Sequence, residues 1–183
     1  MENIQSLFST SNREQALTDI KYTLENYGFE PFQYNIGSLF KGFKAWLTDT
    51  NMDILLLCYQ VLIGSLPEIL KDQEIEREFI RLIPSFIENL GSQKTVVRKS
   101  THRCIASYVK LSLKLELVLN YIINVGLIHS RHRTRQHSML VIPALLSLKK
   151  SWVKDKDNHI VKLVDTVATK LFDSSEIVQK TAK

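Results

Sequence analysis

Apolar residues recur along this chain at the three- and four-residue spacing of amphipathic helices, and short polar phrases separate the apolar runs. The first predicted helix, over about 12–26, ends at Gly28 and Pro31 and places Ala16, Leu17, Ile20 and Leu24 on one face. A second predicted helix, over about 36–47, carries Leu39, Phe40, Phe43, Trp46 and Leu47. No segment shows strand alternation, so the pattern predicts an all-α fold.

The remaining apolar runs predict three more helix pairs. Their ranges are about 54–62 with 74–90, 95–110 with 113–124, and 132–149 with 159–172, and the polar stretch 149–157 connects the last two. Asp49 is the predicted N-terminal cap of the second pair, and Glu74, Glu76 and Glu78 suit the start of a helix. Pro84 and Pro143 lie inside predicted helices and are expected to kink them.

A loop-then-helix phrase recurs along the chain at 49–55, 91–98, 129–135 and 173–179. When Leu55, Arg98, Arg135 and Gln179 are aligned, the phrases lie 43, 37 and 44 residues apart, which is the period of two-helix HEAT or armadillo repeats. We therefore predict an α-solenoid of HEAT repeats, with about four helix pairs and one terminal helix.

The predicted solenoid forms a single domain over 1–183. Its repeats cover roughly 8–48, 49–91, 92–127 and 128–172, and a fifth starts at 173–183. A lone last helix has no neighbour to cover its apolar face, so the chain is expected to be a fragment of a longer protein.

Composition favours a folded protein of the cell interior. The chain is 44% hydrophobic, and its longest apolar run, 54–66, is interrupted by polar residues and is shorter than the roughly 20 residues that cross a bilayer. The first residues lack a signal-peptide pattern, so we expect a soluble, intracellular protein that does not span a membrane. Cys58 and Cys104 lie in apolar helical stretches and are expected to be buried, reduced thiols.

The net charge of +5 is uneven, because 129–137 holds three arginines, three histidines and no acid. Equivalent loops of stacked repeats lie along one edge, which is where such proteins bind. The predicted partner-binding residues on this edge are Thr50, Asn51, Met52, Gln93, Lys94, Arg131, His132, Arg133, Ser174 and Ser175. Their alternative role is that of solvated turn residues. We assign Arg98 and Arg135 to a structural ladder that reaches an Asp or a backbone carbonyl of the neighbouring repeat.

Catalysis and metal binding find little support in the sequence. We see no phosphate-binding loop, no nucleophile elbow and no zinc-protease motif. The spacings of His129, His132 and His137 do not place all three on one helical face, so no metal or cofactor is expected. Asp72 and the glutamates after it could pair for acid–base work, but a helix start explains them better. A HEAT-repeat DNA glycosylase is disfavoured, because Trp46 and Trp152 are far apart in repeat register.

The loop phrases also resemble a known family. Leu47-x-Asp49-x-Asn51, Leu90-Gly91-Ser-Gln-Lys94-x-x-Val97-Arg98 and Phe172-Asp173-Ser-Ser-x-x-Val178 are similar to the loops of TOG domains, the HEAT arrays that bind tubulin. The segment 118–146 looks closest to the N-terminal TOG domain of the crescerin family of ciliary proteins. The resemblance implies a flat paddle whose contact loops carry the residues given above, with Arg13 closing the first loop. That loop, 8–13, lacks the usual Trp, and TOG domains normally have six repeats.

The sequence therefore predicts a non-enzymatic domain that engages tubulin or microtubules through its loop edge. By resemblance it would act in microtubule or axoneme organisation, in the cytoplasm, the cytoskeleton or the cilium, with no small-molecule substrate. The missing Trp leaves open a TOG-like scaffold for another protein. A helical-repeat nucleic-acid binder is the second alternative, and it would bind duplex DNA with a steep dependence on salt.

Overall fold

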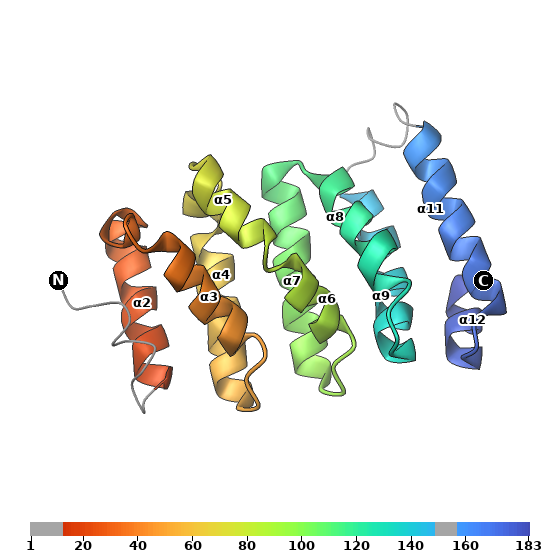
Figure 1. The fold of residues 1–183 in the computed structure, drawn as a ribbon, viewed down its shortest axis with the longest axis horizontal. Helices are drawn as coiled ribbons and strands as arrows, with labels where there is room; N and C mark the ends of the chain where they lie inside the picture. The colour runs from red at the N-terminus through yellow and green to blue at the C-terminus, as the bar shows by residue number, and fades with distance from the viewer. Residues whose placement is uncertain (1–12, 149–156) are drawn as a thin grey trace. The chain divides into compact units, whose positions relative to one another are not determined.

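A computed structural model describes residues 13–148 and 157–183, with side chains from 161 onward in the second range. All regular structure within these ranges is helical, which confirms the predicted fold class. The chain forms two compact units, residues 1–85 and 86–183, and each is described by itself. Figure 1 gives the helix labels used below. The repeat boundaries and the single domain over 1–183 stay predictions.

Unit 1 contains two helical hairpins around an aromatic core. Its elements are α2 (Arg13–Tyr27), η1 (Glu30–Phe32), α3 (Ile36–Trp46), α4 (Met52–Ile69) and α5 (Gln73–Ile80). Helix α2 packs beside α4, and α3 packs on α4 and α5. The first helix buries the four predicted side chains and ends at Gly28, whose φ of 60° suits glycine. In α3, the ring of Phe43 lies edge-on to the rings of Phe40 and Trp46, with 5.5 Å and 5.9 Å between the ring centroids.

Two predictions about the second helix pair were wrong. The cap of α4 is Asn51, not Asp49: the Asn51 side chain accepts the Asp53 N–H at 2.9 Å. The helix predicted over 74–90 is instead two helices, α5 and α6 (Ile83–Leu90), separated by a turn at 81–82. Pro84 fits the break, because proline lacks an N–H and is favoured in the first turn of a helix, where Pro84 lies in α6. In contrast, Pro143 lies inside an unbroken helix.

Unit 2 begins within α6 and continues through the third and fourth helix pairs. Its further elements are α7 (Thr95–Ser112), α8 (Leu115–Tyr121), the π-turn η2 (Ile122–Gly126), α9 (His132–Ser147), α11 (Asp157–Thr169), η3 (Lys170–Phe172) and α12 (Glu176–Ala182). Helix α9 packs beside α7 on one side and α12 on the other, and α8 packs on both α7 and α9. Helix α9 is therefore central to this unit. The predicted connector 149–157 and Trp152 fall outside the described residues, apart from Asp157.

Two glycines allow neighbouring helix ends to approach α9 closely. A Cβ added at Gly91 would lie 2.0 Å from Thr134 Oγ1 and 3.2 Å from its Cα, and one added at Gly126 would lie 2.4 Å from Ser138 Oγ. Both hydroxyls are buried and have no hydrogen-bond partner. Thr134 and Ser138 are four residues apart on one face of α9, so two successive helix ends pack against adjacent turns of this helix.

Helix α4 is the one helix among the described residues that is long and apolar enough to cross a membrane by composition. It has 18 residues and a mean hydropathy of 1.5. Half of it is buried inside the protein, and the core helix of a soluble protein has the same composition, so this is weak evidence for a membrane span. Cys58 and Cys104 are both buried free thiols, as predicted. Burial raises the pKa of the Cys104 thiol strongly.

Substituting Gly91 by Ala should destabilise the protein by about 1–3 kcal/mol, because the new methyl group would overlap Thr134, including its backbone. Gly64→Ala is the matched control: Gly64 lies in α4 with open space around it, so this change should stabilise by up to about 1 kcal/mol. Urea unfolding curves measure both. Equal effects of the two substitutions would contradict the close approach at Gly91.

Candidate protein-interaction loops

Four seven-residue segments share one hydrogen-bonded conformation, and we call them the capped loops. They are residues 49–55, 92–98, 129–135 and 173–179, at the starts of α4, α7, α9 and α12. In each, the side chain of the first residue accepts the backbone N–H of the third, as in an Asx-turn. The bonds are Asp49 Oδ1 to Asn51 at 2.8 Å, Ser92 Oγ to Lys94 at 3.2 Å, His129 Nδ1 to Arg131 at 3.0 Å and Asp173 Oδ1 to Ser175 at 3.0 Å.

The seventh residue closes three of the four loops from the other side. Arg98 Nη1 donates to the carbonyls of Ser92 and Gln93 at 2.7 and 2.9 Å. Arg135 Nη1 makes the equivalent bonds to His129 and Ser130 at 2.8 and 2.9 Å, and Gln179 donates to the carbonyl of Asp173 at 2.6 Å. The first loop has the buried Leu55 at this position. The alignment made from sequence therefore matches the geometry of the loops.

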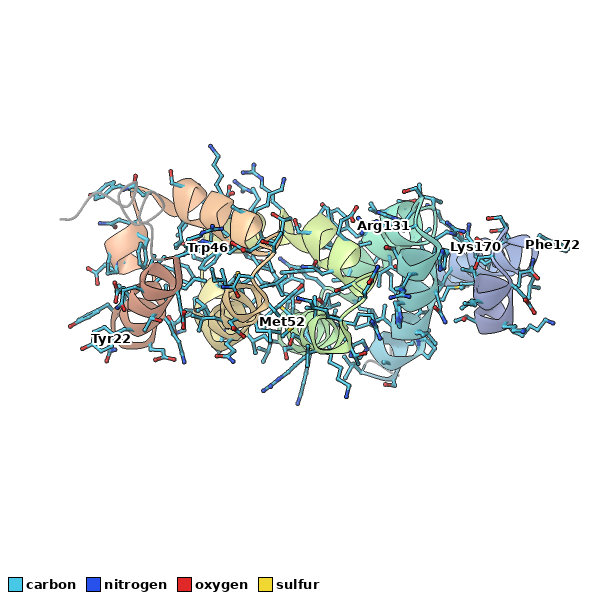
Figure 2. The ribbon with its side chains drawn as sticks, turned by 90° about the horizontal axis from the view of Figure 1, so that it is seen from below. Tyr22, Trp46, Met52, Arg131, Lys170 and Phe172 are labelled. Atoms are coloured by element: carbon cyan, nitrogen blue, oxygen red, sulfur yellow. The ribbon has the colours of Figure 1, made fainter. Side chains whose placement is uncertain are left out.

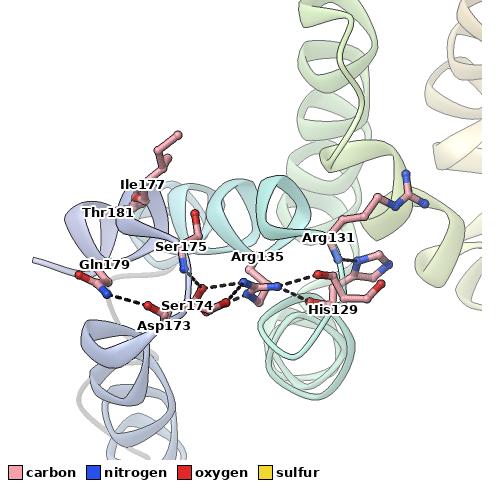
Figure 3. A network of polar contacts seen from close by, with 10 residues as sticks. His129, Arg131, Arg135, Asp173, Ser174, Ser175, Ile177, Gln179 and Thr181 are labelled. Carbon is pink, nitrogen blue, oxygen red and sulfur yellow. Dashed lines mark hydrogen bonds and ion pairs between the residues drawn. The ribbon is translucent and has the colours of Figure 1, made fainter.

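Arg135 also links the last two capped loops to each other (Figure 3). Its guanidinium makes a bidentate pair with Asp173, through Nη2 to Oδ1 at 2.6 Å and Nε to Oδ2 at 2.8 Å. The side chains are only 11% and 5% exposed. The hydrogen bond from Arg135 holds the pKa of Asp173 below its usual value, so this pair stabilises the fold above pH 3.8 and loses that effect as pH falls through the lowered value.

The hydrogen bonds of Arg98 described here stay within its own capped loop, where Nη2 also reaches Thr95 Oγ1 at 2.9 Å. The position equivalent to Asp173 in the next loop is His129, which offers no carboxylate to Arg98. His129 instead contacts Glu88 of α6, with 2.7 Å between Nε2 and Oε1. The two arginines are thus alike in closing their own loops, and they differ in the contact with the following loop.

Replacing Arg135 by Gln should destabilise the protein by about 3–5 kcal/mol, because Asp173 would be left as a buried charge without its partner. Arg98→Gln should cost less, about 1–2 kcal/mol, since it removes hydrogen bonds to carbonyls but strands no buried charge. Denaturant unfolding of the two variants tests the difference. A cost for Arg135→Gln no larger than that for Arg98→Gln would be evidence against the buried pair.

The structure places most of the predicted binding residues at the outer positions of the capped loops. Thr50, Asn51, Gln93, Lys94, Arg131, His132 and Ser174 are exposed, and Met52, Arg133 and Ser175 are partly buried. Within unit 2, the contact of Gly91 with Thr134 and the pair of Arg135 with Asp173 bring the last three loops next to one another. The loop at 49–55 belongs to unit 1. Residues 8–12 of the predicted first contact loop lie outside the described residues.

Two of the predicted cations are already in ion pairs. Arg13, the first residue of α2, donates from Nη1 to Oδ2 of Asp49, which lies before α4, at 2.5 Å. Arg131 is 62% exposed but pairs with Glu88, and Figure 3 shows its guanidinium turned away from the Arg135 cluster. Arg131 therefore offers less free positive charge to a partner than the sequence suggested. The pairing was not readable from the sequence, because Glu88 lies 43 residues earlier.

One prominent exposed side chain was missed as a candidate binding residue. Phe172 is 89% exposed and projects away from the helices of unit 2, directly before the capped loop 173–179 (Figure 2). Ile177, in the same loop, is 51% exposed. Large aromatic residues often dominate the energetics of protein interfaces. The signal in the sequence was an aromatic residue directly before Asp173, in a phrase that served only for the resemblance to the loops of TOG domains.

Two histidines of unit 2 titrate away from their ordinary range. Burial lowers the pKa of His102 and His137, and the charges of Arg98 and Arg133 lower that of His137 further. Among the residues that the structure describes, no three His, Cys, Asp or Glu side chains gather in a way that could hold a metal ion.

Acidification should weaken the fold through these two histidines. The unfolded chain takes up protons near pH 6.5 while the folded form resists them, so the free energy of unfolding should fall as pH drops below 6.5. The variant carrying His102→Gln and His137→Gln should show a shallower fall. Urea unfolding at several pH values between about 7.5 and 5.5 measures the slope. An unchanged slope in the variant would contradict the lowered pKa values.

The chain is similar in fold to solved helical-repeat structures. One, from work on TOG–tubulin binding specificity in microtubule dynamics and mitotic spindle formation, has a TM-score of 0.63 and 15% identity, covering 98% of this chain and 80% of that one. Two designed armadillo-repeat proteins for peptide recognition, one in complex with the peptide (KR)4, have TM-scores of 0.54 and 0.55 and 16% identity, each covering 98% of this chain and 77% of theirs.

No protein-family model matches the sequence, and no curated protein matches it either. At these low identities the likeness concerns the fold alone. The helix order and these similarities together show that the chain has an all-α fold of the HEAT and armadillo class.

Proposed function

We propose that this chain is a non-catalytic interaction domain of TOG type that binds tubulin through its capped loops, in microtubule or axoneme organisation. The observation that carries the proposal is the repeated capping of the loops. Four loops share one hydrogen-bonded turn, and three of them are closed by a side chain from their own helix. The capping orders the backbone of these loops before any partner binds.

The capping fixes the backbone of each loop and leaves side chains in its middle exposed to solvent. In the loop 92–98, for example, Ser92 and Arg98 make the internal bonds, whereas Gln93 and Lys94 are exposed. A loop that is already ordered loses less conformational entropy when it binds, so more of the contact energy appears as affinity. The loops are therefore suited to contact a folded partner with a fixed surface.

Charge alone would not hold such a partner. An exposed ion pair contributes only about 0.2–1 kcal/mol, whereas a micromolar complex needs about 8 kcal/mol. In unit 2, Lys94 and Arg133 can attract an acidic surface, and the exposed Phe172 next to the last loop supplies an apolar anchor. Phe172 thus gives this edge a large exposed aromatic side chain, whereas the predicted first loop lacks the usual Trp.

A TOG-like scaffold for a protein other than tubulin is the second candidate. The pairing of Arg131 with Glu88 favours it, because this pairing reduces the positive charge available to an acidic tubulin surface. The similar armadillo-repeat designs were made for peptide recognition, which fits a protein partner in general. Binding to free tubulin separates the two candidates.

The test is size-exclusion chromatography of the chain with free tubulin. Wild type should co-migrate with tubulin, and the double variant Lys94→Glu with Arg133→Glu should lose co-migration, because it reverses two charges on the loop edge. Phe172→Ala should weaken binding by about tenfold or more, as for a central aromatic contact. The matched control, Lys110→Glu with Lys162→Glu, makes the same charge change on the bodies of α7 and α11 and should still bind.

Circular dichroism should show unchanged helical content in all variants. If wild type fails to co-migrate with tubulin, the result favours the second candidate, a TOG-like scaffold for another protein. If the loop variant binds tubulin as wild type does, the capped loops are not the tubulin-binding surface.

A further inference from the structure

Unit 2 contains a recessed surface that is separate from the outer positions of the capped loops. It is a groove of about 360 Å³ between α7 and α9. Its α7 side is formed by residues at helical spacing, Arg98, Lys99 and His102, and its α9 side includes His137 and Leu140. Grooves of this size can receive a few side chains of a partner.

The groove lies in strongly basic surroundings. Neither α7 nor α9 contains an aspartate or glutamate along its length, and no carboxylate lines the groove. Lys99 is exposed, and Arg98, although bonded to its own loop, keeps its charge at the rim. The positive potential also acts on His137, whose pKa burial lowers and the charges of Arg98 and Arg133 lower further. An anionic ligand would remove this repulsion.

The floor of the groove is apolar. Leu90 and Val141 are buried beneath it, and Leu140 is 52% exposed at its side. Apolar surface between cationic side chains suits a ligand that carries both carboxylates and aliphatic groups. Inorganic anions or simple polyanions would leave this apolar part uncovered.

We propose that the groove between α7 and α9 is a docking site for an acidic peptide segment of a partner protein, with an aliphatic side chain on the apolar floor and carboxylates beside Lys99 and Arg98. Charge complementarity favours an anionic occupant, because cationic side chains and no carboxylates line the groove. The apolar floor favours a peptide over a nucleic acid, and so does the lining, which contains no Phe, Tyr or Trp for bases to stack on and whose rings are the imidazoles of His102 and His137. The inference is independent of tubulin binding by the capped loops.

Fluorescence anisotropy tests the site with the full chain and a short labelled peptide of glutamate and leucine. Wild type should bind it, and added salt should weaken binding. Lys99→Glu should weaken binding about fivefold to tenfold, because it turns an attraction at the rim into a repulsion. Leu140→Ser, which leaves charge unchanged, should weaken it about threefold by removing part of the apolar surface.

Lys110→Glu is the control, since it makes the same charge change in the last turn of the same helix and should alter affinity less than about twofold. The proposal is overturned if the peptide does not bind, or if Lys110→Glu weakens binding as much as Lys99→Glu, which would mean diffuse charge attraction. It is also overturned if a single-stranded oligonucleotide of equal charge binds more tightly than the peptide and shows the same dependence on Lys99.

Discussion

The turns that precede α7, α9 and α12 leave backbone carbonyls that must find hydrogen-bond donors, and this chain supplies each donor from within the helix that follows. Arg98, Arg135 and Gln179 are each the fourth residue of their helix and reach back to the start of the loop. This contact holds the backbone of each loop against the start of the helix that follows, so the capping bonds support the shape of the loops.

The same requirement leads to the one buried ion pair that connects two capped loops. Arg135 has hydrogen-bond donors left after closing its own loop, and Asp173, which organises the next loop, accepts them. Buried charges are costly unless they are paired and hydrogen-bonded, and here both ends also cap loop backbone. Close packing at Gly91 and Gly126 acts on the same helix, α9. The central helix of unit 2 is thus positioned by hydrogen bonds at its start and by steric fit along its side.

The two proposed binding surfaces follow from this arrangement. Side chains that point back into the loops, such as Arg98, are committed to structure, and those between them, such as Lys94, remain free for a partner. The side of α7 that carries Lys99 and His102 faces the groove beside α9. One helix can therefore present a loop to a folded surface and a basic groove to an extended acidic segment. The lack of acids in α7 and α9 is the feature that both proposals share.

The sequence by itself determined the features that depend on neighbouring residues. The buried face of α2, its end at Gly28 and the equivalence of Leu55, Arg98, Arg135 and Gln179 could all be predicted, because helical periodicity and capping act over a few residues. The capping of α4 by Asn51 and the break before Pro84 were missed, although both are local, because two polar residues competed for the cap and the apolar pattern continued across the proline.

Only the tertiary structure decided which charges remain free. The pairing of Arg131 with Glu88 and the pairing of Arg135 with Asp173 each depend on segments about 40 residues apart coming together. The exposure of Phe172 also became visible only in the folded chain. The groove between α7 and α9 likewise exists only when the two helices are packed. A local pattern specifies which face of a helix is apolar, but the partner of a surface charge is set by the packing of distant helices, and that packing is not encoded in any single stretch of sequence.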